Sequence, residues 1–203
     1  MTESTTDATE PAPRPRGRPR RDIDLDTVAD AVADLFAEGG LENVSIGATS
    51  EKLSVSRATL YRTVPTREDL LGILFERSTR ELTASAEQML SAAGEAREQL
   101  VELVSLQVQA AIGMRRYMAV FFGGGGLPPD VLERWHDWSR SFEAMWLRVV
   151  TEAMEAGVLA GADPVVTTRL VLGMCIWISR WYRPDEGWTR EQITGAALSL
   201  LRL

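Results

Sequence analysis

The sequence predicts an all-α protein with a small N-terminal three-helix unit and a larger C-terminal helical domain. Apolar residues recur at three- and four-residue steps along most of the chain, and no stretch alternates apolar and polar residues as a half-buried strand would. Serine or threonine stands where several of the apolar runs begin, and glycine or proline separates them. With 203 residues, 45% hydrophobic and 25% charged, the chain can bury a sizeable core.

The first part of the chain predicts an arm and then a first helix. Residues 1–21 mix Thr, Ser, Pro and Ala with arginine, a composition that cannot bury a core, so we expect this arm to be disordered in isolation. Order is expected from Asp24, and glycines at Gly39 and Gly40 stop the helix. The apolar face of this helix consists of Leu25, Val28, Ala29, Val32, Leu35 and Phe36.

Three hydroxyl side chains stand at N-cap positions and predict the next helices. They are Ser45 before a helix at 46–53, Ser56 before a helix at 57–63, and Thr66 before a long helix that runs towards Leu90. The third helix ends at Val64 because Pro65 disfavours helical backbone in the residue before it. We therefore assign residues 22–67 to the three-helix unit.

The remaining residues, 68–203, predict the larger helical domain. Beyond the fourth helix, glycine and proline signals separate the apolar runs. These runs predict helices at 96–112, 114–122, 129–156, 163–182 and 189–202.

The second and third helices, joined by a tight turn, have the spacing of a helix-turn-helix, whose second helix lies in the major groove of DNA. Arg57 at its N-terminal end can offer two donors to a guanine edge, and Thr59 can give a methyl to thymine or a hydroxyl to phosphate. Tyr61, Arg62 and Arg67 suit phosphate contacts. Taken alone, the same segment is equally a solvated turn of helix on some other helical protein.

Residues 55–62 and 65–71 resemble the recognition helix and the start of the fourth helix of the TetR family of transcription regulators. Residues 36–46 are similar to that family's first-helix end and second-helix start, and the whole match covers 24–75. The resemblance implies a homodimer that binds a roughly palindromic operator in double-stranded DNA. The DNA-contacting residues predicted in this unit are Ser45, Ser56, Arg57, Thr59, Tyr61, Arg62 and Arg67.

The chain departs from the family pattern in the turn and around it. Ser54 replaces the usual turn glycine, so it would have to adopt a left-handed conformation at a cost of about 1 kcal/mol relative to glycine. The other departures are Val64 for an aromatic residue, Arg67 for lysine, and Thr49 and Ser50 for a more apolar pair.

The arm carries a second DNA-binding feature. Arg16-Gly17-Arg18 and the following proline resemble the core of an AT-hook, in which Arg16 and Arg18 would enter a narrow A·T-rich minor groove. The alternative is a solubilising or phosphate-touching tail without sequence preference. The chain's net charge is −7, and residues 22–67 hold four basic against eight acidic side chains, so we expect DNA binding to depend on the arm.

Large apolar side chains gather at helical spacing in the second domain and form a candidate ligand-binding set. This set is Phe121, Phe122, Trp135, Trp138, Phe142, Met145, Trp146, Met174 and Trp177. It is either plain core or the lining of a cavity for a hydrophobic small-molecule effector. Residues 181–193 are similar to a terminal pattern among actinobacterial TetR regulators, some of which answer lipid or acyl-CoA effectors.

The helices at 163–182 and 189–202 both carry apolar faces, and the family resemblance implies that they form the homodimer as a four-helix bundle. Gly173 and Gly195 would permit close approach. The predicted function is therefore a DNA-binding transcriptional regulator, by default a repressor that a hydrophobic effector releases from its operator. The alternative is a DNA-binding regulator with no small-molecule effector, which is controlled by a partner or is constitutive.

Other functional classes find little support in the sequence. His136 is the single histidine and has no metal-ligating neighbours, and no nucleophile stands beside a base, so we expect no enzyme activity, metal or cofactor. Cys175 lies among apolar residues and is expected to be buried and inert. The longest apolar stretch, 170–179, is too short for a membrane span and no secretory signal is visible, so we expect a cytoplasmic protein.

Overall fold

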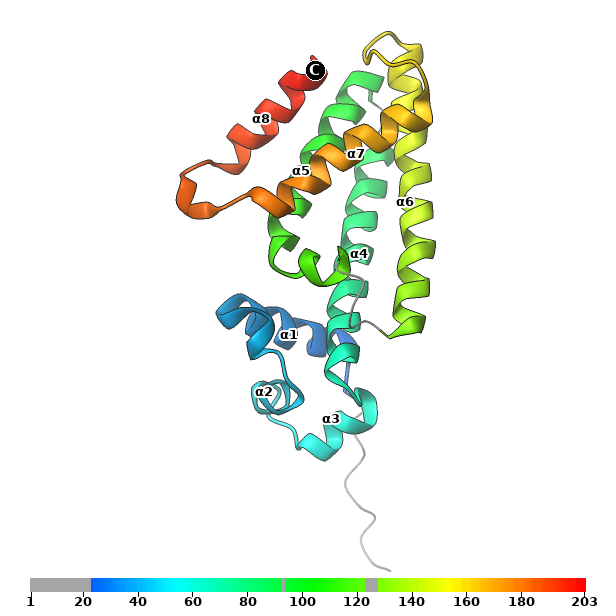
Figure 1. Cartoon of the computed structure of the whole chain (residues 1–203). Coiled ribbons are helices and arrows are strands. Elements are labelled where there is room, and N and C mark those ends of the chain that lie inside the picture. Colours follow the sequence, from blue (N-terminus) through cyan, green and yellow to red (C-terminus); the bar gives the residue numbers. More distant parts are fainter. Residues whose placement is uncertain (1–22, 93, 123–127) are drawn as a thin grey trace, which may run out of the picture.

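The structure of the chain is a computed structural model that describes residues 23–92, 94–122 and 128–203, with only the backbone described at 116–122. Within these ranges it contains eight α-helices, two short 3-10 helices and no strand, which confirms the predicted all-α class. Figure 1 shows α1 to α3 gathered at one end of the molecule and α5 to α8 at the other, with α4 running from one group into the other.

The N-terminal helices begin at the predicted caps. Their bounds are α1 (Leu25–Gly39), the 3-10 helix η1 (Gly40–Asn43), α2 (Ile46–Lys52) and α3 (Arg57–Thr63). The Ser45 side chain accepts the N–H of Ala48, and the Ser56 side chain accepts the N–H of Thr59, each over 3.1 Å. These bonds satisfy amide groups that have no partner within the first turn of a helix.

One small apolar core holds α1, α2, α3 and the start of α4 together. Leu60 of α3 and Val64 after it are fully buried. The core residues are Val28, Val32, Leu35, Phe36, Val44, Ile46, Leu60, Val64, Leu70, Leu71 and Leu74. Val64 thus packs in this core, at the position where the sequence departs from the aromatic residue of the family pattern.

Helix α4 (Arg67–Ser91) links this core to the second domain. A capping box fixes its start, because Thr66 accepts the N–H of Asp69 over 3.1 Å while Asp69 accepts the N–H of Thr66 over 3.0 Å. Leu70, Leu71 and Leu74 belong to the N-terminal core, and Leu82 and Ala86 belong to the second one. One rigid element therefore contributes to both cores.

Helix α5 (Ala96–Phe122) is continuous, so the predicted break between helices at 96–112 and 114–122 is wrong. A glycine inside a helix costs about 1 kcal/mol relative to alanine, which a long, well-packed helix tolerates. Gly113 is exposed and follows two buried residues, Ala111 and Ile112, that anchor the helix to the core. Packing on that side outweighs the local preference of the glycine.

The remaining helices lie within a residue or so of the predicted bounds: α6 (Pro129–Glu155), α7 (Pro164–Trp181), the 3-10 helix η2 (Pro184–Glu186) and α8 (Arg190–Leu201). Helix α5 packs most extensively against α7 and also against α8, α4 and α6. Their shared core includes Leu103, Val108, Trp146, Val150 and Cys175. The second domain is therefore a helical bundle with α5 at its centre.

No helix in the described part of the chain is long and apolar enough to cross a membrane. Among the same residues, no cluster of His, Cys, Asp and Glu has the arrangement of a metal site.

Candidate nucleic-acid interface and effector domain

The turn between α2 and α3 is built around a left-handed serine. Ser54 has φ 53°, which confirms the conformation expected where the family has glycine. Its N–H donates to the carbonyl of Glu51 over 3.0 Å, and the N–H of Val55 donates to the carbonyl of Ser50 over 3.0 Å. Small polar residues tolerate this backbone region better than larger ones, so the two short helices keep a tight turn without glycine.

Helix α3 presents a polar face to solvent. Leu60 anchors the helix in the core, while Arg57, Tyr61 and Arg62 are exposed. Thr59 is half-buried, and its hydroxyl lies 2.7 Å from that of Ser56. Three of the side chains predicted to contact DNA from this helix, Arg57, Tyr61 and Arg62, are therefore accessible, and Thr59 is accessible in part.

The two cap serines are exposed, and each accepts a hydrogen bond from the backbone of the helix that it begins. The Ser45 oxygen accepts from the backbone of α2, which leaves its hydroxyl proton as a donor that suits a phosphate. The Ser56 hydroxyl is engaged by both the backbone and the hydroxyl of Thr59. The Ser56 hydroxyl thus has two hydrogen-bond partners within α3, whereas the Ser45 hydroxyl has one within α2.

Arg67 lies half-buried against the preceding backbone. Its Nε donates to the carbonyl of Val44 over 2.8 Å, and its Nη2 donates to the carbonyl of Leu41. The guanidinium therefore ties the start of α4 to η1 and to Val44, which follows it. Sequence reasoning placed this cation on phosphate and missed the bracing role, because the two carbonyls lie 23 and 26 residues away in the chain.

An acidic side chain that the sequence analysis did not single out lies beside the start of α3. Glu51 Oε1 is 3.8 Å from Arg57 Nη2. On the other side of the unit, Lys52 pairs with Asp34 over 3.2 Å and with Glu38 over 2.8 Å, and the bond to Glu38 chiefly raises the pKa of Lys52. Arg16 and Arg18 lie outside the described residues.

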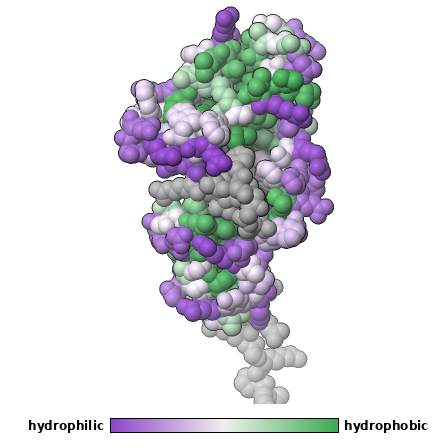
Figure 2. Space-filling model, in the orientation of Figure 1, coloured by the Kyte–Doolittle hydropathy of each residue, from purple (hydrophilic) through white to green (hydrophobic). Residues whose placement is uncertain are grey.

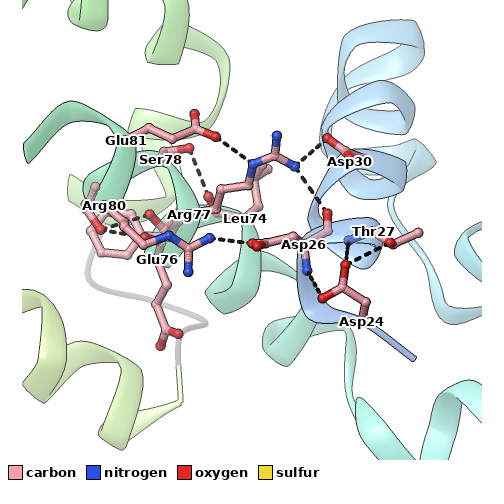
Figure 3. A network of polar contacts seen from close by, with 12 residues as sticks. Asp24, Asp26, Thr27, Asp30, Leu74, Glu76, Arg77, Ser78, Arg80 and Glu81 are labelled. Atoms are coloured by element: carbon pink, nitrogen blue, oxygen red, sulfur yellow. Dashed lines mark hydrogen bonds and ion pairs between the residues drawn. The ribbon is translucent and has the colours of Figure 1, made fainter. Parts of the chain in front are cut away.

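A network of ion pairs joins α1 to α4 (Figure 3). Arg77 Nε donates to Glu81 over 2.7 Å, while its Nη1 donates to the carboxylate of Asp30 and, over 3.2 Å, to the carbonyl of Asp26. Arg80 pairs with the Asp26 carboxylate. The hydrogen bonds to Glu81 and then Asp30 raise the pKa of Arg77, which stays charged at every ordinary pH. The position of α1 is therefore coupled to that of α4.

Helix α6 is fastened to the same stretch of α4. Arg134 Nε donates to Glu76 over 2.6 Å, and its Nη1 donates to Asp130 over 2.9 Å. A Cβ added at Gly72 would lie 2.9 Å from Val131, so the two helices touch where the glycine leaves room. Ion pairs between distant residues, such as Arg134 with Glu76, cannot be predicted from the sequence, because each charged side chain also has oppositely charged residues nearby in the chain.

Part of the predicted ligand-binding set comes together in the core of the second domain. Phe142 and Trp146 are buried, and Trp138 and Met145 are partly buried against the same cluster. Trp138 stacks on Phe142 with ring centroids 5.1 Å apart and donates from Nε1 to Thr83 of α4 over 2.8 Å. These four side chains are therefore packed against α4 and α5.

The rest of that set does not join them. Trp135 is half-buried, with its ring centroid 5.0 Å from that of His136. Met174 and Trp177 line a groove between α7 and α8 instead. The side chains of Phe121 and Phe122, like residues 123–126, lie outside the described part of the chain.

Among the described residues of the second domain, two polar atoms are buried without a hydrogen-bond partner: Trp146 Nε1, a donor, and Gln107 Oε1, an acceptor. An orphaned buried polar group of this kind costs about 1–3 kcal/mol. Cys175 is also buried, and burial raises the pKa of its thiol to about 12, so it stays protonated and unreactive as expected.

An apolar groove of about 380 Å³ lies between α7 and α8. Its lining includes Met174, Trp177, Trp181, Trp188, Ile193 and Leu200. Hydrophobic surface extends across the upper part of the molecule in Figure 2, the end at which Figure 1 places both helices. Leu170, Trp177 and Leu200 are 69%, 63% and 76% exposed, which is unusual for such large apolar side chains.

These features define a class of protein: a helix-turn-helix unit with an exposed second helix, joined through α4 to a helical bundle. Residues 93–203 match the family described as tetracyclin repressor-like, C-terminal domain. The chain belongs to the TetR family of transcriptional regulators, whose members bind operator DNA and dimerise. No curated protein sequence matches the chain.

Solved structures of several other proteins share the fold at low sequence identity. A TetR/AcrR-family regulator from Thermobifida fusca superposes with a TM-score of 0.77 and 20% identity, covering 87% of this chain and 95% of that one. AibR, in complex with isovaleryl coenzyme A and operator DNA, superposes with a TM-score of 0.71 and 18% identity, and the match covers 87% of this chain and 97% of AibR. The ketosteroid transcriptional regulator KstR2 of Mycobacterium tuberculosis superposes with a TM-score of 0.68 and 18% identity, and the match covers 92% of this chain and 96% of KstR2.

Proposed function

We propose that this chain is a homodimeric transcriptional repressor that binds a roughly palindromic operator through α3 and is released from it by a hydrophobic small molecule. The observation that carries the proposal is the exposed polar face of α3, held by Leu60 and preceded by a tight turn. A major groove admits one helix of this kind, and Arg57 at its N-terminal end is suited to a guanine edge.

The proposed dimer uses α7 and α8. Val166, Leu170, Trp177 and Trp181 follow helical spacing along α7 and are all exposed, and Leu200 and Trp188 add to them at α8. Among the described residues, nothing lies within 4 Å of a Cβ added at Gly173, which lies between Leu170 and Trp177 on this face, so a second helix could approach closely there. Two copies joined through these helices form a four-helix bundle and place two α3 helices on one operator.

The proposed effector site lies in the second domain near the orphaned polar atoms. A ligand with an apolar body and a hydroxyl or carbonyl group would satisfy Trp146 Nε1 or Gln107 Oε1 while its body packs against Phe142 and Met145. Of the similar solved structures, AibR is in complex with isovaleryl coenzyme A and KstR2 is described as a ketosteroid transcriptional regulator. Acyl thioesters and steroid-like compounds are therefore the first classes to screen.

The proposed signal passes along α4. The effector would favour a conformation in which α4 and α6 shift, and Arg77 and Arg80 would carry that shift to α1. Because α5 also contacts η1, the second domain has two connections to the DNA-binding unit.

The experiment that tests this function incubates the purified full-length protein with fragmented genomic DNA and sequences the retained fragments. We expect a shared motif with twofold symmetry that the Arg57→Ala variant no longer enriches. Thermal shift with acyl-CoA esters and steroids then separates the two regulatory modes: stabilisation and loss of the motif support effector control. Enrichment without any stabilising compound favours the regulator that has no small-molecule effector.

The arginine arm is proposed to supply part of the affinity. Deleting residues 1–21 removes five arginines from a protein whose unit at 22–67 is acidic, so we expect weaker operator binding and a shallower dependence of log affinity on log salt concentration. Fluorescence anisotropy over a salt series measures both. Equal affinity and equal slope for the truncated protein would contradict this role.

A further inference from the structure

The first residue of the recognition helix is held against α2 by two features that sequence reasoning did not reveal. Arg57 Nη2 lies 3.8 Å from Glu51 Oε1, and the same nitrogen would lie 3.2 Å from a Cβ added at Gly47. Gly47 and Glu51 are four residues apart, so they share one face of α2. The guanidinium of Arg57 therefore extends along this face, over the glycine and towards the carboxylate.

This ion pair contributes little to folding. The side chains of Arg57 and Glu51 are 69% and 77% exposed, and surface pairs of this kind stabilise a protein by about 0–1 kcal/mol. Arg62, further along α3, has no ion pair among the described residues. The Glu51 carboxylate thus lies beside the arginine at the N-terminal end of α3, the end that is proposed to enter the major groove. Its main effect is therefore on the net charge that Arg57 presents to DNA.

A neighbouring carboxylate affects the two kinds of DNA contact differently. Binding to a phosphate depends on the net charge of the side chain and is the same for every sequence. Contact with a guanine edge depends on directed N–H donors, and the 3.8 Å between Nη2 and Glu51 Oε1 is too long for a hydrogen bond, so the Nη1 and Nη2 N–H groups of Arg57 keep their capacity to donate together. Pairing with Glu51 therefore weakens phosphate binding by Arg57 more than it weakens base contact.

We propose that Glu51 is a specificity-determining residue that positions Arg57 and neutralises it, so that Arg57 contacts a base in the operator instead of a phosphate on any sequence. This inference rests on the proposed role of α3 in DNA binding. It also assigns a function to Glu51, one of the eight acidic side chains at 22–67, where only four side chains are basic.

The test measures the affinity of the full-length protein for a random-sequence 30-base-pair duplex over a salt series. In Glu51→Gln the freed arginine gains a phosphate, so we expect about fivefold or more tighter binding at 0.1 M salt and a steeper slope by about 0.9 per protomer. Glu42→Gln is the matched control, since it also removes one exposed carboxylate of the unit, and no ion pair to Glu42 is found in the described residues. It should leave the slope unchanged.

A double-mutant cycle assigns the effect to the pair. In an Arg57→Ala background, Glu51→Gln should change binding to the random duplex no more than Glu42→Gln does. On the operator identified from genomic DNA, Glu51→Gln should lower the ratio of operator affinity to random-duplex affinity. Circular dichroism checks that all variants are folded.

The outcomes separate this inference from the proposed function. A wild-type protein that binds no duplex overturns both. A wild type that binds its operator, with Glu51→Gln equal to Glu42→Gln or with an effect that persists in Arg57→Ala, overturns the role of Glu51 alone.

Discussion

Arg67 shows how one side chain can fix the junction between the helix-turn-helix unit and α4. Its two hydrogen bonds to the carbonyls of Val44 and Leu41 hold the start of α4 against the segment before α2. A lysine at this position would offer one ammonium group in place of a planar fork, so it would not reach both carbonyls in the same geometry. The arginine here therefore does more than preserve the positive charge of the family's usual lysine.

A substitution at Gln107 tests whether the unpaired polar atoms buried in the second domain bind an effector or stabilise the fold. Gln107→Leu removes the orphaned Oε1 at similar volume, so we expect the free energy of unfolding to rise by about 1–3 kcal/mol and effector binding to be lost. Urea unfolding and thermal shift measure the two effects. A loss of stability of the size usual for a disrupted core would instead assign Gln107 a structural role.

Cys175 reports on the packing of α7 against the core. Raising the pKa of its thiol from 9.0 to about 12 lowers the thiolate fraction at pH 8 about a thousandfold, and burial adds a steric block. We expect no reaction with a thiol-specific chromogenic reagent in the native state and complete reaction of the single cysteine in denaturant. Rapid reaction of the native protein would mean that α7 opens readily.

At the scale of helices, local signals in the sequence predict where a helix starts better than whether it continues. Ser45, Ser56 and Thr66 mark three helix starts correctly, because a cap acts on the next few residues alone. Gly113 predicted a break that tertiary packing overrides. Partners far apart in the chain, such as Arg77 with Asp30 or Glu51 with Arg57, depend on how helices meet and could not be predicted from spacing.

Two glycines in this fold should respond to alanine in opposite ways. Gly113→Ala adds a methyl to an exposed position of α5 with no described atom within 4 Å, so we expect stabilisation by about 0.5–1 kcal/mol. Gly72→Ala is the contrasting variant, because its Cβ would lie 2.9 Å from Val131 on α6 and should destabilise the protein. Chemical denaturation of both variants checks the pair. Equal effects would contradict the continuous α5 or the close contact of α4 with α6.

At the scale of the whole molecule, the sequence predicts two ends with different tasks, and the structure shows how they are joined. The small core at one end and the bundle at the other share α4, and ion pairs from α1 and α6 converge on it within Glu76–Glu81. Within the described residues, the candidate ligand-binding set divides between the bundle core and the α7–α8 groove, and Trp135 joins neither. Helical spacing alone could not show this division, since it does not say which helix a face will meet.

The exposed stripe on α7 predicts the oligomeric state. Leu170→Glu and Trp177→Glu place a charge in the proposed dimer interface, so we expect a folded monomer with operator affinity reduced at least tenfold. Light scattering after size-exclusion chromatography measures the mass. Leu25→Glu, at a half-exposed position of α1, is the control and should remain a dimer. A dimer that survives both α7 substitutions would place the interface elsewhere.

The central claim is that two copies of α3 contact one operator as a symmetric dimer. The most direct measurement is a footprint of the purified dimer on a duplex retained from genomic DNA, for the wild type and for Arg57→Ala. We predict protection over two half-sites related by a dyad, centred about one helical turn or a multiple of it apart, and loss of this protection in the variant. Protection of a single, asymmetric site, or a footprint that Arg57→Ala leaves unchanged, would contradict it.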